Sequence, residues 1–267
     1  MNANSSSLVP SCSRGWWMGL GNMLSKEMGA WWRTRLWWVQ CLIALLLLNG
    51  TMALTLKLGG SVSSAAMTFL EIMALGVPVA AISLGQDSIL GERHSWTAAW
   101  VLSKPLRRPA FILAKLIAHG QGLLVAWVVL PGTIAYFQLL TGGGIQLSSV
   151  GFAGAMGLVY LNLFFYLTFS LMLATLFNGR GPVLGIALLV AWSGPMQFIG
   201  LALQKYTPWL DLILPWRLVV SVGNDASLAE YLAVGNPLPT VTPIIATVLW
   251  CVLFVIVAIW RIHREEF

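Results

Sequence analysis

Charged residues are scarce in this sequence. Aspartate, glutamate, lysine and arginine make up 9% of its 267 residues, whereas 58% are hydrophobic and the mean hydropathy is +0.82. Soluble domains carry about 25% charged and about 45–50% apolar residues. The composition therefore argues against a water-soluble protein and predicts an integral membrane protein. The net charge of +6 comes from basic residues between long apolar runs, so we expect no nucleic-acid partner.

Cysteine is also rare. The three cysteines, Cys12, Cys41 and Cys251, are far apart, and two of them lie inside apolar runs. This spacing predicts neither a disulfide framework nor a metal site. The histidines add no metal-binding cluster, because His94 and His119 are 25 residues apart and His263 is more distant still.

Motifs of catalysis and nucleotide binding are missing as well. The sequence has no GxxxxGK[ST] phosphate loop, and the glycines at 142–144 are followed by Ile-Gln-Leu with no lysine to reach a phosphate. No serine, histidine and acid set indicates a nucleophile. We therefore predict no enzyme activity and no cofactor, and any ATP hydrolysis would belong to a separate polypeptide.

The N-terminal residues divide into a tail and a helix. Residues 1–15 are polar and predict a disordered tail, and no apolar segment with a cleavage site follows to make a secretory signal. Residues 16–35 predict an amphipathic helix in the membrane interface. Its apolar face carries Trp17, Leu20, Leu24, Met28 and Trp31, and Asn22, Lys26 and Arg33 fall on the opposite face. The alternative is a soluble extension of the first span.

Six apolar runs are long enough to cross a bilayer, for which about 20 residues suffice. The predicted membrane domain is 36–261, and a short tail, 262–267, follows it. We expect the second span to be interrupted at Gly76 and Pro78, and Pro131 and Gly132 to kink the continuation of the third towards Leu140. The predicted spans are 36–56, 65–85, 110–130, 150–176, 182–203 and 241–260.

The connection between the last two spans, 204–240, alternates prolines, aromatics and aliphatics. It predicts an interfacial or re-entrant hairpin, which would be either a lid or a passive packing loop. Within it, Ser227 and Glu230 fit a capping box, and Gly235 is placed to end the short helix that this box starts.

Basic residues set the orientation. With six spans and both termini on one side, twelve of the 15 lysines and arginines fall on that side, and only Lys57, Lys205 and Arg217 fall on the other. Positive residues collect on the cytoplasmic side. We therefore expect both termini in the cytoplasm and the protein in the plasma membrane, which is the inner membrane of a bacterial cell.

The longest charged interruption is 87–115, which contains Asp87, Glu92, Arg93, Lys104, Arg107, Arg108 and Lys115. Ser95 is suited to start a short helix over 96–102, and Pro105 to end it. Trp96 and Trp100 are four residues apart and share a face of this helix. Aromatic residues on an exposed helix are good anchors for a partner protein. The alternative is that both tryptophans lie flat on the bilayer.

These motifs resemble the six-helix permease subunit of type-2 ABC exporters. The resemblance rests on an elbow with Lys26, Glu27, Arg33 and Arg35 before the first span, and on a Glu-Arg pair, a Lys-Pro turn and basic residues after the second. The family often has Gly-Thr after the Glu-Arg pair, where this sequence has Ser95-Trp96-Thr97. The second set comprises Glu92, Arg93, His94, Trp96, Trp100, Lys104, Pro105, Arg107 and Arg108, with Lys115 at the start of the third span.

The resemblance implies a fold and a partner. The fold is an all-α integral membrane protein with six transmembrane helices, an N-terminal elbow helix, and a cytoplasmic coupling helix between the second and third spans. The coupling helix would sit in a cleft of an ATP-binding cassette ATPase, and two permeases would form a homodimer or a heterodimer. From the residues alone, Arg107 and Arg108 could equally bind anionic headgroups.

Polar residues inside the spans are candidates for a substrate path. Glu71 is the sharpest, because a carboxylate at span depth needs a cavity or a partner. It could also lie near the extracytoplasmic mouth, where water reaches it. Asn49 is a second candidate, although interhelical hydrogen bonding is the more ordinary role for an amide in a span.

Two functions fit these observations. The first is the membrane-spanning permease of an ATP-driven exporter, coupled to a separate ATPase. The alternative is an accessory subunit of a larger respiratory or photosynthetic complex without transport activity, since a fold does not fix a function. The presence of an ATP-binding partner would separate them.

Overall fold

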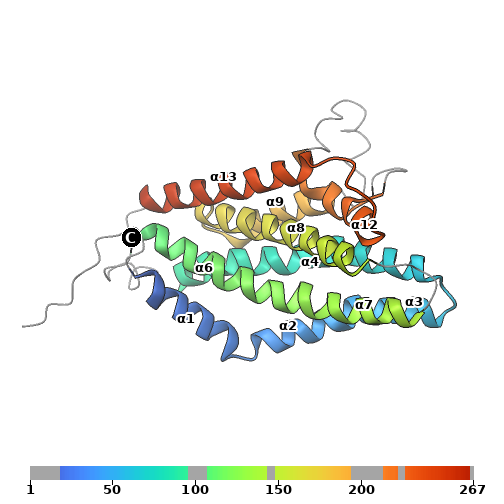
Figure 1. Cartoon of the computed structure of the whole chain (residues 1–267). Coiled ribbons are helices and arrows are strands. Elements are labelled where there is room, and N and C mark those ends of the chain that lie inside the picture. Colours follow the sequence, from blue (N-terminus) through green and yellow to red (C-terminus); the bar gives the residue numbers. More distant parts are fainter. Residues whose placement is uncertain (1–18, 96–106, 143–147, 194–212, 222–225, 265–267) are drawn as a thin grey trace, which may run out of the picture.

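A computed structural model describes residues 19–95, 107–142, 148–193, 213–221 and 226–264, which form an elongated bundle of helices (Figure 1). No strand occurs in these ranges, which confirms the predicted all-α membrane class. The elements in chain order are α1 (Leu20–Trp32), α2 (Leu36–Ala44), η1 (Leu45–Asn49), α3 (Gly50–Lys57), α4 (Val62–His94), α6 (Arg108–Leu123), η2 (Leu124–Val129), α7 (Leu130–Gly142), α8 (Ser149–Leu176), α9 (Arg180–Ser193), η3 (Pro215–Leu218), α12 (Leu228–Ala233) and α13 (Thr242–Arg264).

Five helical runs in the described residues are long and apolar enough to cross a membrane. They are Trp37–Lys57, Val62–His94, Arg108–Gly142, Ser149–Leu176 and Thr242–Arg264. The shorter α9 covers the first part of the predicted fifth span, and residues 194–203 of that prediction lie outside the described residues. The second and third runs are much longer than the predicted spans, by 12 and 14 residues.

The helices α4 and α8 form the centre of the bundle and pack along each other. Their backbones approach closely at Gly85. A Cβ atom at this position would overlap the Ser170 hydroxyl and lie 2.9 Å from the carbonyl oxygen of Leu167. Small residues allow such an approach, and in membranes the van der Waals packing it creates is the main force that joins helices. Glycine at 85 therefore sets how deeply α4 packs on α8.

Proline does not interrupt α4, so the expected break at Gly76 and Pro78 is wrong. Helix α4 runs unbroken for 33 residues with Pro78 inside it. Proline cannot donate to the carbonyl four residues earlier, and a neighbouring helix can compensate in a membrane. The carbonyl that Pro78 leaves without its backbone donor is that of Ala74. One residue further on, Trp192 of α9 donates its indole N–H to the carbonyl of Leu75 at 3.3 Å and joins α9 to α4 beside the proline.

The helix that contains Pro131 also continues to Gly142, and its irregularity is a π-helical segment, η2, directly before the proline. A second π segment, η1, lies in the facing helix and ends at Asn49. The Asn49 amide donates to the carbonyl of Pro131 at 3.0 Å and to Gln138 at 3.3 Å. Asn49 therefore makes the interhelical hydrogen bonds that an amide in a span was expected to make.

The capping box predicted in the last connection is confirmed. The Ser227 hydroxyl accepts from the Glu230 N–H, and the Glu230 carboxylate accepts from the Ser227 N–H. The Glu230 side chain also accepts from the Ser221 hydroxyl at 2.8 Å. Gly235, with φ of 85°, follows the end of α12, where only glycine adopts this conformation readily.

Helix lengths show that one end of the bundle extends beyond the bilayer. A turn at 58–61 joins α3 to α4, so Lys57 and Val62 lie at one level, and a Cβ at Gly142 would contact Val62. The first span has 21 residues, about 31 Å at a rise of 1.5 Å per residue, close to the hydrocarbon thickness. Counted from that shared level, the last ~11 residues of α4 and the first ~13 of α6 project roughly 15–20 Å past the start of α2.

Figure 1 shows the same arrangement, because the start of α6 and the end of α13 lie together beyond the corner between α1 and α2. We call this part of the bundle the projecting end. It contains the last turns of α4, the first turns of α6 and the obliquely placed α1.

Replacing Gly85 by alanine should destabilise the protein by about 1–3 kcal/mol, because the added methyl group forces α4 away from α8. The matched control is Gly76→Ala on the same helix, where an added Cβ meets nothing within 4 Å. That change should be neutral or slightly stabilising, since alanine favours a helix. Thermal unfolding in detergent measures both variants, and equal melting temperatures would contradict the packing argument.

Candidate functional site

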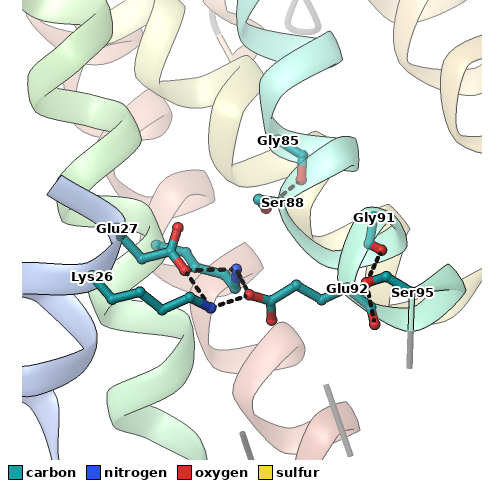
Figure 2. A network of polar contacts seen from close by, with 8 residues as sticks. Lys26, Glu27, Gly85, Ser88, Gly91, Glu92 and Ser95 are labelled. Atoms are coloured by element: carbon teal, nitrogen blue, oxygen red, sulfur yellow. Dashed lines mark hydrogen bonds and ion pairs between the residues drawn. The ribbon is translucent and has the colours of Figure 1, made fainter. Parts of the chain in front are cut away.

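Four charged residues meet at the projecting end, and we call them the four-charge network. Lys26 and Glu27 come from α1, Glu92 from the last turn of α4, and Lys115 from the second turn of α6 (Figure 2). These three helices are far apart in the sequence. The network therefore joins the N-terminal helix to the two helices that flank the charged segment between α4 and α6.

The Lys115 ammonium group is the centre of the network. Its nitrogen lies 3.2 Å from Glu27 Oε1 and 3.1 Å from Glu92 Oε1. The same Glu92 oxygen accepts from Lys26 at 2.8 Å, and Lys26 lies 3.6 Å from Glu27 Oε1. Two ammonium groups thus alternate with two carboxylates, and the network is neutral as a whole.

The burial of these side chains decides how much the network contributes to stability. Lys115 is 1% exposed and Glu27 8%, whereas the Lys26 side chain is half exposed. A buried charge is costly unless it is paired, and removal of one partner leaves the others uncompensated. Lys115 also lies over the Phe111 ring, with 4.9 Å from its nitrogen to the centroid. The helices can pack here only if the partners of Lys115 are in place.

Lys26 shows the electrostatic effect directly. Partial burial of its ammonium group lowers the pKa, but the hydrogen bond and the charge of Glu92, with a smaller contribution from Glu27, outweigh it. The pKa is raised above 10.5, so Lys26 stays protonated at physiological pH.

Helix α1 reaches its position because its buried face fits α6. Met23, Glu27 and Trp31 recur every four residues and are buried. The indole of Trp31 lies directly over Gly122, where any Cβ would overlap it. Leu24 and Met28, which the sequence placed on the apolar face, are half-buried. The buried face of α1 therefore includes the Glu27 carboxylate, which the sequence placed in the elbow helix but not on its apolar face.

Two arginines of the predicted coupling set bind helix ends inside the protein. Arg93 donates to the carbonyls of Ala174, Thr175 and Phe177 at 3.0–3.2 Å, at the C-terminus of α8. Arg108 donates to the carbonyls of Ile262 and His263 at 2.7 and 2.6 Å, at the C-terminus of α13. A cation is favourable at this end of a helix, where carbonyls lack partners.

The remaining members of the coupling set divide between the described residues and the rest. Arg107 is exposed at the start of α6, and His94 Nδ1 lies 2.6 Å from the Leu90 carbonyl oxygen. Ser95 was expected to start a helix, and it closes α4, since its hydroxyl donates to the Gly91 carbonyl at 2.8 Å. Figure 2 shows this contact next to Glu92. The other predicted members, Trp96, Trp100, Lys104 and Pro105, lie outside the described residues.

The elbow and the predicted substrate path are found in separate places. Arg33 and Arg35 are exposed at the turn between α1 and α2. Glu71 is exposed near the opposite end of α4, where it lines a recess of about 260 Å³ with Ser221 and Glu230. Asn49 is buried between helices. The structure therefore brings Lys26, Glu27 and Glu92 together but not Glu71 and Asn49.

Sequence reasoning missed the central role of Lys115. The signal was present, because a lysine in the apolar run of a long helix must find a carboxylate or an aromatic partner. Glu27 and Glu92 were both recorded, but 65 residues separate them. Nothing in their local pattern indicates that they share one lysine.

The network has the chemistry of a structural ion-pair cluster, which holds helices together. Within the described ranges, no three histidines, cysteines or acids are grouped to hold a metal ion. The carboxylates are held by lysines and face no cavity that the structure shows. What the geometry defines is a multi-span helical membrane protein with a rigid charged end outside the bilayer.

The comparison with known families identifies the class in full. The model of the ABC-2 family transporter proteins matches residues 22–267, and the chain belongs to this family. Among curated proteins, it is similar to the probable ABC transporter permease protein NosY of Stutzerimonas stutzeri, with 27% identity over 260 residues, which cover 87% of this chain and 91% of that protein. It is also 27% identical to the protein of the same description from Pseudomonas aeruginosa, over 75% and 76% of the two chains. The protein is an ABC transporter permease.

Replacing Lys115 by methionine should destabilise the protein by about 3–5 kcal/mol, because Glu27 and Glu92 then face each other without their buried cation. Lys26→Met is the matched control, and it should cost less than about 1 kcal/mol because Lys26 is half exposed. Thermal unfolding in detergent measures both changes.

The double variant Lys115→Met with Glu92→Gln tests the coupling. It removes one charge of each sign, so it should lose less stability than the sum of the two single changes. Additive losses, or a Lys115→Met variant as stable as Lys26→Met, would contradict the role of the network.

Proposed function

We propose that this permease belongs to an ATP-driven exporter, and that a separate ATP-binding cassette ATPase pushes on the segment between α4 and α6. The observation that carries the proposal is the projecting end. Ser95 follows α4 and Arg107 precedes α6, and both helices extend roughly 15–20 Å past the start of α2. A soluble partner can reach a segment that starts and ends there.

The same geometry weighs against the alternative in which Trp96 and Trp100 lie flat on the bilayer. Both residues follow His94 closely in the sequence, and His94 is the last residue of the projecting α4. An aromatic pair intended for the headgroup layer would be expected at the level of the α1–α2 corner, where Trp37 and Trp38 stand.

The four-charge network gives the ATPase a way to move the membrane helices. A push on the segment between α4 and α6 acts on Glu92 and Lys115 at its two sides, and through Glu27 on α1. Arg93 and Arg108 extend the connection to the ends of α8 and α13. Force applied at one segment would then reach five helices as a unit, as alternating access requires.

Orientation and assembly complete the proposal. The cations of the described residues support cytoplasmic placement of the projecting end, with both termini, in the plasma membrane. Lys57 and Arg217 are the described basic residues at the opposite end. A permease of six spans would pair with a second copy or a related permease to enclose a pathway. Export is the direction implied by the type-2 exporter resemblance.

For the substrate path we propose the unburied side of α4 near Glu71. Membrane-spanning helices rarely expose a carboxylate to lipid, because a charge in hydrocarbon is costly. Glu71 is exposed in the single chain, roughly 14 Å along α4 from Val62, which is about mid-depth in the bilayer and far from the network. The recess it shares with Glu230 would then open towards the pathway between two permeases. Asn49, which is buried and hydrogen-bonded, is better suited to a structural role.

Replacing Trp96 and Trp100 together by alanine should abolish, or reduce at least tenfold, co-purification with the cognate ATPase and stimulation of its ATP hydrolysis. The reason is that interface anchors of this kind often contribute 2 kcal/mol or more, which corresponds to about 30-fold in affinity. The measurement is pull-down in mild detergent followed by an ATPase assay.

The control is Trp260→Ala, which removes an exposed tryptophan from a membrane-spanning helix. It should leave complex formation unchanged. An intact, active complex with the double variant would exclude the coupling role, and a native particle without any ATP-binding chain would favour the accessory-subunit alternative.

A further inference from the structure

The corner between α1 and α2 carries two arginines whose side chains bind no other residue in the described part of the chain. Arg33 and Arg35 are exposed, and neither guanidinium has a hydrogen-bond or ion-pair partner among the described residues. This contrasts with Arg93 and Arg108, which bind carbonyls inside the bundle. The contrast shows that the charges at the corner are available to a partner.

The corner lies at the surface of the bilayer. The first span has 21 residues and occupies about 31 Å, so Arg33 and Arg35 stand just outside a hydrocarbon layer about 30 Å thick. A second marker agrees with this level. Trp38 precedes the end of the first span by 19 residues, and Trp260 follows the start of α13 by 18, and both indoles are about half exposed. Tryptophan collects at membrane–water interfaces.

The surface next to the two arginines is apolar and continuous. Trp38 and Leu42 of α2 and Leu46 of the following η1 recur at a spacing of four residues and are 45%, 50% and 65% exposed. Trp32 and Trp37 pack together behind the corner, with ring centroids 5.8 Å apart. Two cations thus stand directly above an apolar stripe, which is the pattern that matches a molecule with an anionic head and an alkyl tail.

We propose that this corner, formed by Arg33, Arg35 and Trp38 with the apolar stripe of α2, is a binding site for an anionic phospholipid. The two guanidinium groups would hold the phosphate of the headgroup, which suits their planar donors. The acyl chains would lie along Leu42 and Leu46. The bound lipid would fix the angle between α1 and α2, and hence the position of Glu27 in the four-charge network.

The test is native mass spectrometry of the full chain in detergent, titrated with phosphatidylglycerol or with phosphatidylcholine. Phosphatidylglycerol should bind more tightly to the unaltered protein. Arg33→Gln and Arg35→Gln should each weaken that binding about fivefold, and the double variant about 25-fold, as expected for cations at a bilayer surface. Phosphatidylcholine binding should not change.

The matched control is Arg264→Gln, which removes one exposed charge near the same side of the membrane, where Arg264 lies over the Trp260 ring. It should leave phosphatidylglycerol binding unchanged. The proposal is overturned if Arg264→Gln weakens binding as much as either corner variant, if the two lipids bind equally, or if inorganic phosphate competes as well as the lipid. Melting temperatures without added lipid verify that the variants are folded.

Discussion

A buried lysine that must be neutralised from two sides determines how this permease is assembled at its charged end. Lys115 is enclosed almost completely, and the two carboxylates that compensate it come from α1 and α4. Because an unpaired charge in such a place is far more costly than an exposed one, α1 cannot shift along α6 without losing Glu27. The fit of Trp31 over Gly122 fixes the same register sterically. Electrostatics and packing therefore specify one position of α1.

The membrane-spanning part is held by different forces. No hydrophobic effect drives helices together in lipid, so close packing and interhelical hydrogen bonds must do so. Gly85 lets α4 approach α8, and Asn49 and Trp192 donate interhelical hydrogen bonds to the carbonyls of Pro131 and Leu75. The result is a bundle in which long helices pass through the bilayer and extend beyond it. Their charged ends lie where a charged side chain has a smaller desolvation cost than in hydrocarbon.

The proposed coupling to a separate ATPase would use this division. Residues that transmit a partner's movement must be bound to the helices that move. Glu92 binds α1 and α6, Arg93 binds the end of α8, and Arg108 binds the end of α13. The corner at Arg33 and Arg35 stands one step away, at the bilayer surface, where lipid and protein meet. On the two proposals, lipid at the corner and the ATPase through Glu27 would act on the same helix, α1.

The sequence by itself determined the helical membrane class, the strong bias of positive charge, the capping box at Ser227 and Glu230 and the termination at Gly235, because each depends on residues close together in the chain. It could not determine that Pro78 leaves α4 unbroken, since a proline inside a membrane helix is tolerated where neighbouring helices pack around it, and those neighbours are distant in the sequence. Nor could it show that Lys26, Glu27, Glu92 and Lys115 form one network. Their meeting depends on how far α4 and α6 project beyond the bilayer and on which face of α1 turns inward, and only the packing of whole helices decides both.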